Sequence, residues 1–582
     1  MASKPKLSKP VPIPSPGPKP LPLPFPPIEL PWPRPPWWDE ILRLYIDCNQ
    51  RILIVADGGL NFSASSAFGL TELIAALGSG APGFMPVAIT TAHRASGAGA
   101  THTNFRFDAP PVPLTRANFD QLWMFGIAQG TSRNTVAGTN AAYNPGDGLN
   151  DAEISAITTF MDAGGGVFAT GDHATLGFAM CGTLPRIREM RNWTSVPMGL
   201  ETTLDKNGQL DALRRIDTLA DPMSNTDYEF DDQSDVFPQR LYLHYRQATA
   251  GGSWVPHPLL SSPTRVIDVF PDHPHESECT VAVDPTKAYT EAGLNFPEFP
   301  GVGTTQPVEV VASSMSGGRF LGLSATNPAY GKPPVNPRSF GAISAYNGDA
   351  VSRGRIVCDS TWHHFVNVNL NGVGTPFVTG LGSVRSGFVG VPDVYNQIKR
   401  YYSNIARWLA PVDRRRCRLF LDLVDIRFNT MLIEELPIPI PDLPDPPPWP
   451  LLRQLGVTVR SALASRVGDA MADQMINEAL LDSELAKGNL AVLSLDKAEP
   501  SLFDFEGLRL SLLGGFMHYF AAALPGTPEE LVGKINKKTS HRLIDEVIGA
   551  AIQKSQSQVG PQVLESARRD VERLGPLARK GG

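Results

Sequence analysis

Three short clusters of acidic residues and histidines have the side chains that catalysis or metal binding requires. They are Gly171-Asp172-His173, the segment Asp272 to Glu276 (DHPHE) and the segment Asp359 to His364 (DSTWHH), and each comes at or just after the end of a predicted strand. In an open parallel sheet, ligands bind beyond the carboxyl ends of the strands. We therefore expect the three clusters to share one edge of a sheet and to form one site.

Two kinds of chemistry fit these residue types. Neutral imidazole and carboxylate groups bind zinc and similar metals, so a divalent metal such as zinc is one expected cofactor. Alternatively, Asp359 orients His363 or His364 as a general base for water, with the Gly58 and Gly59 amides near the developing charge. The predicted catalytic residues are Asp172, His173, Asp359 and His363, and the predicted metal ligands are His273, His275, Glu276 and His364.

A purely structural interpretation of the same residues stays open. Asp172 would cap the helix that follows it, as acidic residues commonly do at helix amino termini. Asp272 and Glu276 would accept hydrogen bonds from loop amides. His363 and His364 would pack beside Trp362.

Between residues 45 and 412, short apolar runs alternate with stretches of helical periodicity, which is typical of an α/β sheet. The predicted helices are Ser65–Leu77, a helix capped by Asn150 that runs through Phe160, and a helix from about Val394 to Leu409. The predicted strands are Arg51–Asp57, Pro86–His93, Phe119–Gly126, Gly164–Gly171, Arg265–Phe270, Val308–Ser314, Arg319–Ser324 and Gly354–Ser360. The expected fold class is α/β, with a flavodoxin-like, mainly parallel sheet flanked by helices.

Four segments resemble the class I glutamine amidotransferase-like fold, in particular its trehalose-utilisation (ThuA-like) branch. They are RILIVADGG from Arg51, FDQLWMFG from Phe119, FMDAGGGVFATGDHATLG from Phe160 and GRIVCDSTWHH from Gly354. The resemblance covers roughly residues 48 to 410. It implies a hydrolase-like activity on a small polar or carbohydrate-like substrate.

The turn after the Gly164–Gly171 strand departs from the amidotransferase pattern. A glutaminase needs a cysteine there, because the helix amino end lowers the thiol pKa and backbone amides receive the oxyanion. Asp172 and His173 occupy the turn instead, and Cys181 falls inside the next predicted helix. We therefore expect a chain that is not a cysteine-dependent glutaminase, and we interpret Cys181 as a buried apolar residue.

Proline-rich segments divide the chain. Residues 1–44 form an extended arm with tryptophans set among prolines, residues 45–412 the α/β domain, residues 413–450 a connecting segment with the proline-rich stretch PIPIPDLPDPPPWP, and residues 451–582 a small all-α domain. Proline fixes φ and removes a backbone donor, which favours polyproline structure. The arms are expected to dock on this chain, on an identical copy or on another protein.

Composition excludes several other classes of protein. The chain has 582 residues, 42% of them hydrophobic and 19% charged, with a net charge of -7. Without a basic excess, binding to nucleic acid or to an anionic membrane has no general electrostatic support. The five cysteines are widely spaced, which favours neither a disulfide scaffold nor a zinc finger. No secretion signal is recognised, so a cytoplasmic location is expected.

Two non-enzymatic functions remain alternatives to the hydrolase. One is an amidotransferase-like module that binds a small molecule without turning it over. The other is a structural or assembly protein that docks through its proline-rich arms. Convergence of the three clusters would favour the enzyme, whereas their dispersal or burial would favour the alternatives.

Overall fold

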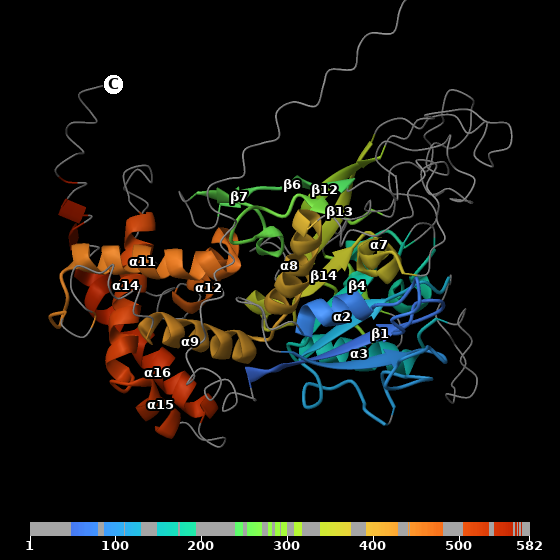
Figure 1. Ribbon diagram of the computed structural model, residues 1–582, viewed down its shortest axis with the longest axis horizontal. Coiled ribbons are helices and arrows are strands. Elements are labelled where there is room, and N and C mark those ends of the chain that lie inside the picture. Colours follow the sequence, from blue (N-terminus) through green and yellow to red (C-terminus); the bar gives the residue numbers. More distant parts are fainter. Residues whose placement is uncertain are drawn as a thin grey trace, which may run out of the picture.

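Figure 1 shows the computed structural model, in which an α/β part and a helical part lie side by side. The structure describes residues 48–78, 87–109, 111–129, 148–172, 175–193, 239–247, 253–270, 278–281, 286–290, 293–299, 308–316, 338–373, 392–428, 440, 443–480, 505–534, 540–562, 565–566, 568–569 and 572. The expected arm at 1–44 and the predicted strand Arg319–Ser324 lie outside these ranges.

The centre of the α/β part is a mixed, mainly parallel sheet. Among the described residues it has eight strands in the order β2-β1-β3-β4-β14-β13-β12-β6. The first five in this order are parallel to their neighbours, and β13, β12 and β6 continue the sheet antiparallel. The strands are β1 (Gln50–Ala56), β2 (Val87–His93), β3 (Gln121–Phe125), β4 (Gly166–Thr170), β6 (Tyr242–Leu243), β12 (Val308–Ser316), β13 (Arg338–Tyr346) and β14 (Ile356–Asp359).

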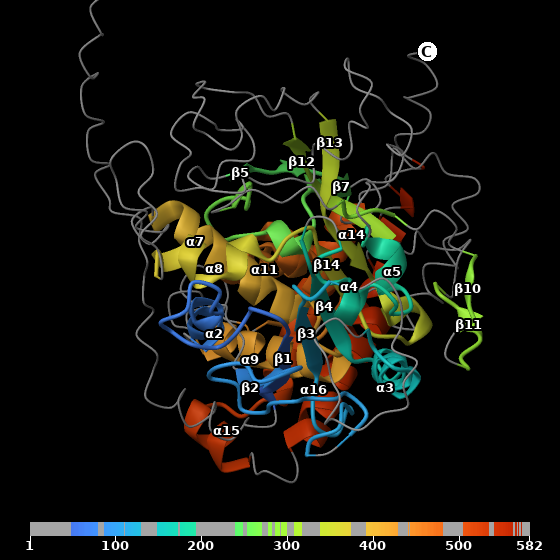
Figure 2. The same ribbon diagram turned by 90° about the vertical axis from the view of Figure 1, so that its right-hand side faces the viewer.

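Helices cover both faces of this sheet (Figure 2). Successive strand side chains point to opposite faces, so Ile52 and Ile54 of β1 join one hydrophobic cluster while Leu53 and Val55 join the other. The first cluster contains residues of α2 (Thr71–Gly78), α7 (Asn367–Asn371) and α8 (Pro392–Trp408), and the second contains residues of α3 (Asp151–Asp162), α4 (Phe178–Cys181) and α5 (Ile187–Met190). Burial on both faces explains why the inner parallel strands β1, β3 and β4 are mostly apolar.

The Asn150 cap predicted for the helix before β4 is confirmed. The Asn150 side chain accepts a hydrogen bond from the Glu153 amide, and the Glu153 carboxylate accepts one from the Asn150 amide. This capping box satisfies two amides that the first turn leaves without helical partners. The Glu153 carboxylate also pairs with buried Arg94, which follows β2, so the start of α3 is fixed to the sheet.

The prediction that Arg265–Phe270 is a strand of the main sheet is wrong. Within this segment the structure has a two-residue strand, β9 (Val269–Phe270), which pairs with β5 (Gln239–Arg240) in a separate sheet. Asp268 forms ion pairs with Arg240 and Arg265, whose side chains are 68% and 47% exposed. These charged side chains suit a surface segment and would be costly in a strand buried on both faces.

Strand β13 was not predicted, because its sequence RSFGAISAY is rich in small residues and lacks the usual β-branched pattern. The small residues serve a close approach of two chain segments. A Cβ atom on Gly341 would lie 2.0 Å from the Cys279 carbonyl oxygen. Two further short sheets pair β7 (Arg246–Gln247) with β8 (Trp254–Val255) and β10 (Ala288–Tyr289) with β11 (Phe296–Pro297).

Helices dominate the chain after α8, as expected for residues beyond 450. They are α9 (Val412–Phe428), α11 (Trp449–Val467), α12 (Asp469–Leu480), α14 (Phe505–Ala523), α15 (Pro528–Lys534) and α16 (Ser540–Lys554). Helix α9 lies within the expected connecting segment, and its apolar residues join the same core cluster as α8 and α11. In the part of the chain that the structure describes, no helix is both long and apolar enough to cross a bilayer.

Glycines allow helices α11 and α14 to pack closely. A Cβ atom on Gly456 would lie 1.8 Å from the Leu510 carbonyl oxygen, and one on Gly514 would lie 1.8 Å from the Leu452 carbonyl oxygen. The two backbones therefore meet where neither helix has a side chain. This contact accounts for two glycines inside helices, where glycine is otherwise unfavourable.

A disulfide joins Cys48, just before β1, to Cys417 in α9, with the Cα atoms 5.7 Å apart. It links positions separated by 369 residues, so it ties the first strand of the sheet to the first helix of the helical part. The other cysteines, Cys181, Cys279 and Cys358, are free and buried. Neither the number of cysteines nor their spacing pointed to this pair.

We expect titration of the unfolded, unreduced protein to find three thiols and titration after reduction to find all five. Reduction should also lower the free energy of unfolding by about 2–4 kcal/mol, because the crosslink restricts the unfolded chain. Chemical denaturation with and without reductant measures this change. Five thiols before reduction would contradict the pairing.

A buried ion-pair cluster holds α12 against the sheet. The Arg355 side chain, which precedes β14, is 2% exposed and pairs with Asp349 at 2.7 Å and with Glu478 of α12. The Glu478 carboxylate also accepts a hydrogen bond from Arg415 of α9 at 2.9 Å. Burial alone would raise the pKa of Glu478, but the charges of Arg355 and Arg415 outweigh burial and lower this pKa to about 2.

The low pKa of Glu478 predicts a loss of stability in acid. Because the folded-state pKa is below the ordinary value of 4.5, the contribution is complete above that pH and is lost as the pH falls toward 2. Glu478→Gln should lower the free energy of unfolding at neutral pH by about 2–3 kcal/mol, since Arg355 and Arg415 lose one of the two carboxylates that they share and keep only Asp349. It should also flatten the acid part of the stability curve.

Urea denaturation between pH 2 and pH 7 checks this prediction. The matched control is Glu546→Gln, which removes the exposed pair of Glu546 with Arg542 and should leave the curve unchanged. Parallel curves for wild type and Glu478→Gln below pH 5 would contradict the assigned role of Glu478.

Candidate functional site

Two of the three predicted clusters meet at the carboxyl edge of the sheet. Strands β4 and β14 are parallel neighbours in a register that places Asp359 beside Thr170. The residues that follow these strands, Gly171-Asp172 and Ser360-Thr361, therefore leave the sheet side by side. A short 3-10 helix, His363–Phe365, begins two residues later and turns its histidines back toward the sheet.

The first carboxylate–imidazole pair joins Asp172 to His363. The Asp172 Oδ2 atom lies 3.0 Å from His363 Nε2, and Asp172 Oδ1 accepts a hydrogen bond of 3.0 Å from the Thr361 hydroxyl. The Asp172 side chain is 1% exposed, whereas the His363 side chain is 16% exposed. The His363 ring also stacks on Trp362 with centroids 4.4 Å apart. A buried carboxylate thus orients an imidazole that solvent reaches.

The second pair joins Asp359 to His364 and is sealed in the core. The Asp359 Oδ2 atom lies 2.9 Å from His364 Nε2 and accepts a hydrogen bond of 2.8 Å from the Tyr401 hydroxyl. The Asp359 and His364 side chains are both 0% exposed. Phe270 and Phe365 pack on the His364 ring, with centroids 4.1 and 4.5 Å away. This pair stabilises the core and is closed to a substrate.

Thr361 connects the two pairs. Its amide donates to Asp359 Oδ1 at 3.3 Å, and its hydroxyl donates to Asp172 Oδ1 at 3.0 Å. The hydroxyl also accepts a hydrogen bond from the His363 amide at 3.1 Å. One threonine therefore sets the position of both carboxylates and of the histidine that solvent reaches.

Arg191, which follows α5, lies buried behind these residues. Its guanidinium donates to the carbonyl oxygens of Asp172 at 2.8 Å, Asp359 at 3.1 Å and Ser360 at 2.8 Å, and it lies over the ring of Trp193. Burial lowers the pKa of Arg191, although nearby thiols and Asp172 oppose this effect. A single arginine beside a tryptophan has no signature in the sequence, so this residue was not predicted.

A third buried carboxylate, Asp57, follows β1 on the same edge. Its Oδ1 atom accepts hydrogen bonds from the Ile127 and Ala128 amides at 2.6 and 2.9 Å, which fixes the segment after β3. Its Oδ2 atom is buried without a hydrogen-bond partner among the described residues. Burial raises the pKa of Asp57 above its usual value. The next residues, Gly58 and Gly59, are exposed at this edge.

Most of the predicted metal ligands fall outside the described part of the chain. His173, His273, His275 and Glu276 lie outside the described residues, and so does Asp272. Among the residues that are described, no group of three or more histidine, cysteine, aspartate or glutamate side chains is arranged to hold a metal. The fourth predicted ligand, His364, directs Nε2 to Asp359. Asp172 does not cap the following helix α4, whose N-cap is Gly177.

The interpretation of Cys181 as a buried apolar residue agrees with the structure. Cys181 is the last residue of α4 and is 0% exposed. Burial raises the pKa of its thiol well above the usual value, and Asp57 adds to this shift. Burial also raises the pKa values of the Cys279 and Cys358 thiols. None of these thiols has the environment of a thiolate nucleophile.

Comparisons of the chain with protein-family models, with curated proteins and with solved structures gave no match.

A substitution at the sealed Asp359–His364 pair should lower stability without altering the Asp172–His363 pair. Tyr401→Phe removes the hydroxyl that donates to Asp359 and leaves the ring packing intact. We expect the free energy of unfolding to fall by about 1–3 kcal/mol, because a buried carboxylate loses a donor. Chemical denaturation measures this loss. A variant as stable as wild type would show that the Tyr401–Asp359 hydrogen bond contributes nothing to folding.

Proposed function

We propose that this chain is a hydrolase-like enzyme that acts on a small polar or carbohydrate-like substrate. The observation that supports it best is the Asp172–His363 pair, with 3.0 Å between carboxylate and imidazole, a buried carboxylate and a partly exposed ring. This arrangement is the one that catalytic acid–base histidines use. The substrate class follows from the resemblance to the ThuA-like branch of the amidotransferase-like fold.

We also propose that the α/β part has a flavodoxin-like fold, and the order of its parallel strands supports this. In the sheet the parallel strands lie in the order β2-β1-β3-β4-β14. If they are numbered one to five along the chain, this order is 2-1-3-4-5. Flavodoxin-like domains have this order and bind ligands beyond the carboxyl ends of the strands. The Asp172–His363 pair lies at that edge.

In the proposed mechanism, Asp172 holds the tautomer and the orientation of His363. His363 then takes a proton from water as the water attacks the substrate, and it returns the proton to the leaving group. Asp172 stabilises the imidazolium that forms in between. Thr361 keeps Asp172 in place through the hydrogen bond to Oδ1.

A non-catalytic ligand-binding module is the second candidate. The observation that favours it is the burial of Asp359, which was one of the predicted catalytic residues and is 0% exposed. With Asp359 committed to His364 and Tyr401, Asp172 and His363 are the predicted catalytic residues that the structure brings together. Such a pair can also bind a hydroxyl group without turnover.

Other parts of the functional interpretation stay predictions. A divalent metal such as zinc at His273, His275 and Glu276 is one of them, and a cytoplasmic location is another. Docking of the proline-rich arms on an identical copy or on another protein also stays a prediction.

Substitution of each member of the pair tests the enzyme. A panel of chromogenic 4-nitrophenyl esters and glycosides first identifies a substrate for the wild-type chain. Asp172→Asn and His363→Ala should then each lower kcat/KM by about 10²–10⁴-fold, which is the usual contribution of an oriented acid–base histidine. KM should change much less, because the pair acts mainly in the transition state.

The matched control is His102→Ala, which removes another partly exposed histidine next to β2 and should retain wild-type activity. Equal kcat/KM values for wild type, Asp172→Asn and His363→Ala would overturn the proposed mechanism. Binding of the same compounds without turnover, weakened by His363→Ala, would favour the ligand-binding module.

A further inference from the structure

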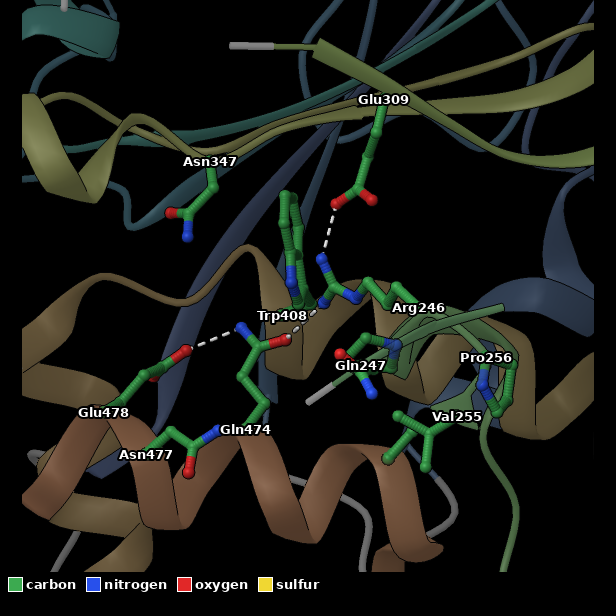
Figure 3. Close-up of a pocket in the computed structure, with 12 residues that line it drawn as sticks. Arg246, Gln247, Val255, Pro256, Glu309, Asn347, Trp408, Gln474, Asn477 and Glu478 are labelled. Carbon is green, nitrogen blue, oxygen red and sulfur yellow. Dashed lines mark hydrogen bonds and ion pairs between the residues drawn. The ribbon is translucent and has the colours of Figure 1, made fainter. Parts of the chain in front are cut away.

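A polar cavity of about 190 Å³ lies where the α/β part meets the helical part. Figure 3 shows its walls: Glu309 of β12 and Asn347 after β13 on one side, α12 on the opposite side, and the β7–β8 hairpin with Arg246 at one end. Trp408, the last residue of α8, stands between the two sides. Ligand sites occur preferentially at such junctions between structural units.

This cavity is separate from the Asp172–His363 pair. Asn347 directly follows Tyr346, which pairs with Ile356 at the start of β14, whereas Asp359 ends that strand. The cavity is therefore at the amino edge of the parallel strands and the pair is at the carboxyl edge. None of the residues that line the cavity belongs to the candidate active site.

The charged groups of the cavity neutralise one another. Arg246 pairs with Glu309 at 2.6 Å, and Glu478 is held by Arg355 and by Arg415. A charged ligand would find no uncompensated partner and would lose its hydration. The lining therefore disfavours phosphates, carboxylates and ammonium groups.

Four of the nine remaining lining residues carry carboxamides. They belong to Gln247, Asn347, Gln474 and Asn477. Each carboxamide offers both a donor and an acceptor, as hydroxyl groups do. Gln474 is oriented by a hydrogen bond of 2.6 Å from its Nε2 atom to Glu478 and lies toward Arg246, so this amide is preorganised in the wall (Figure 3).

One buried N–H group of the cavity lining lacks an acceptor among the described residues. Trp408 is 2% exposed and lines the cavity, and its Nε1 atom has no hydrogen-bond partner.

An unsatisfied buried donor costs about 1–3 kcal/mol. An oxygen-rich molecule in the cavity would supply the missing acceptor. A cavity of about 190 Å³ holds roughly six water molecules at about 30 Å³ each. This space suits one sugar ring or one cyclic polyol and is too small for an oligosaccharide.

We propose that this cavity binds a neutral polyhydroxylated molecule of the size of a single sugar ring. The carboxamides and the indole N–H of Trp408 form hydrogen bonds with its hydroxyl groups. Because the walls come from the sheet and from α12, the bound molecule bridges the α/β part and the helical part. It is a second ligand site that acts independently of the Asp172–His363 pair.

The test uses the full-length protein with D-glucose and myo-inositol as probes and inorganic phosphate as the charged comparison. Thermal unfolding and calorimetric titration should show saturable binding of at least one neutral probe, with a melting temperature that rises with probe concentration. Phosphate should produce no saturable effect. Gln247→Leu, at an exposed wall position, should weaken the binding of the neutral probe about tenfold or more, which is about 1.4 kcal/mol.

Gln454→Leu is the matched control, since it makes the same change at an exposed position of α11 outside the cavity, and it should bind the probe as wild type does. His363→Ala should also leave binding unchanged, which separates this site from the proposed active site. Absence of saturable binding by both neutral probes would overturn the proposal and identify the cavity as a water-filled junction. Equal weakening by Gln247→Leu and Gln454→Leu, or tighter binding of phosphate, would overturn it as well.

Discussion

The guanidinium of Arg191 fixes the two loops that carry the candidate active site. It donates to main-chain carbonyl oxygens of Asp172, Asp359 and Ser360, which end neighbouring parallel strands. If the loops moved apart, a buried cation would lose hydrogen bonds that no solvent replaces, at a cost of several kcal/mol. The 3.0 Å contact of Asp172 with His363 depends on this constraint, because each partner comes from a different loop.

Strand β14 and helix α8 each extend from the candidate active site to the junction with the helical part. At its carboxyl end β14 carries Asp359 in the sealed pair, and before its first residue Arg355 binds Glu478 of α12. Helix α8 places Tyr401 on Asp359 and ends at Trp408 in the cavity. The proposed catalytic pair and the proposed sugar-sized site therefore lie at opposite ends of β14, and the last turns of α8 connect the sealed pair to the cavity.

The sequence predicted the parallel strands well, because strands buried on both faces are continuous apolar runs such as RILIVA and GVFAT. It also brought Asp172 and His363 together, since residues after neighbouring parallel strands share an edge. It misplaced Arg265–Phe270 because the apolar residues of this short segment, RVIDVF, resemble those of a strand although charged residues interrupt them. It could not separate His363 from His364, because exposure of adjacent histidines depends on tertiary packing by Phe270 and Tyr401. The cavity could not be predicted from the sequence either, because its walls come from segments that are far apart in the chain.

The central claim is that one of the two adjacent carboxylate–imidazole pairs is open to solvent and the other is not. Hydrogen–deuterium exchange at the imidazole carbon of histidine tests this claim most directly. His363 and His364 fall in one peptide, and fragmentation mass spectrometry reads them separately. The side-chain exposures of 16% and 0% predict that His363 exchanges in native protein while His364 stays protected. Equal exchange of the two rings, or faster exchange at His364, would contradict this assignment of a reachable and a sealed pair.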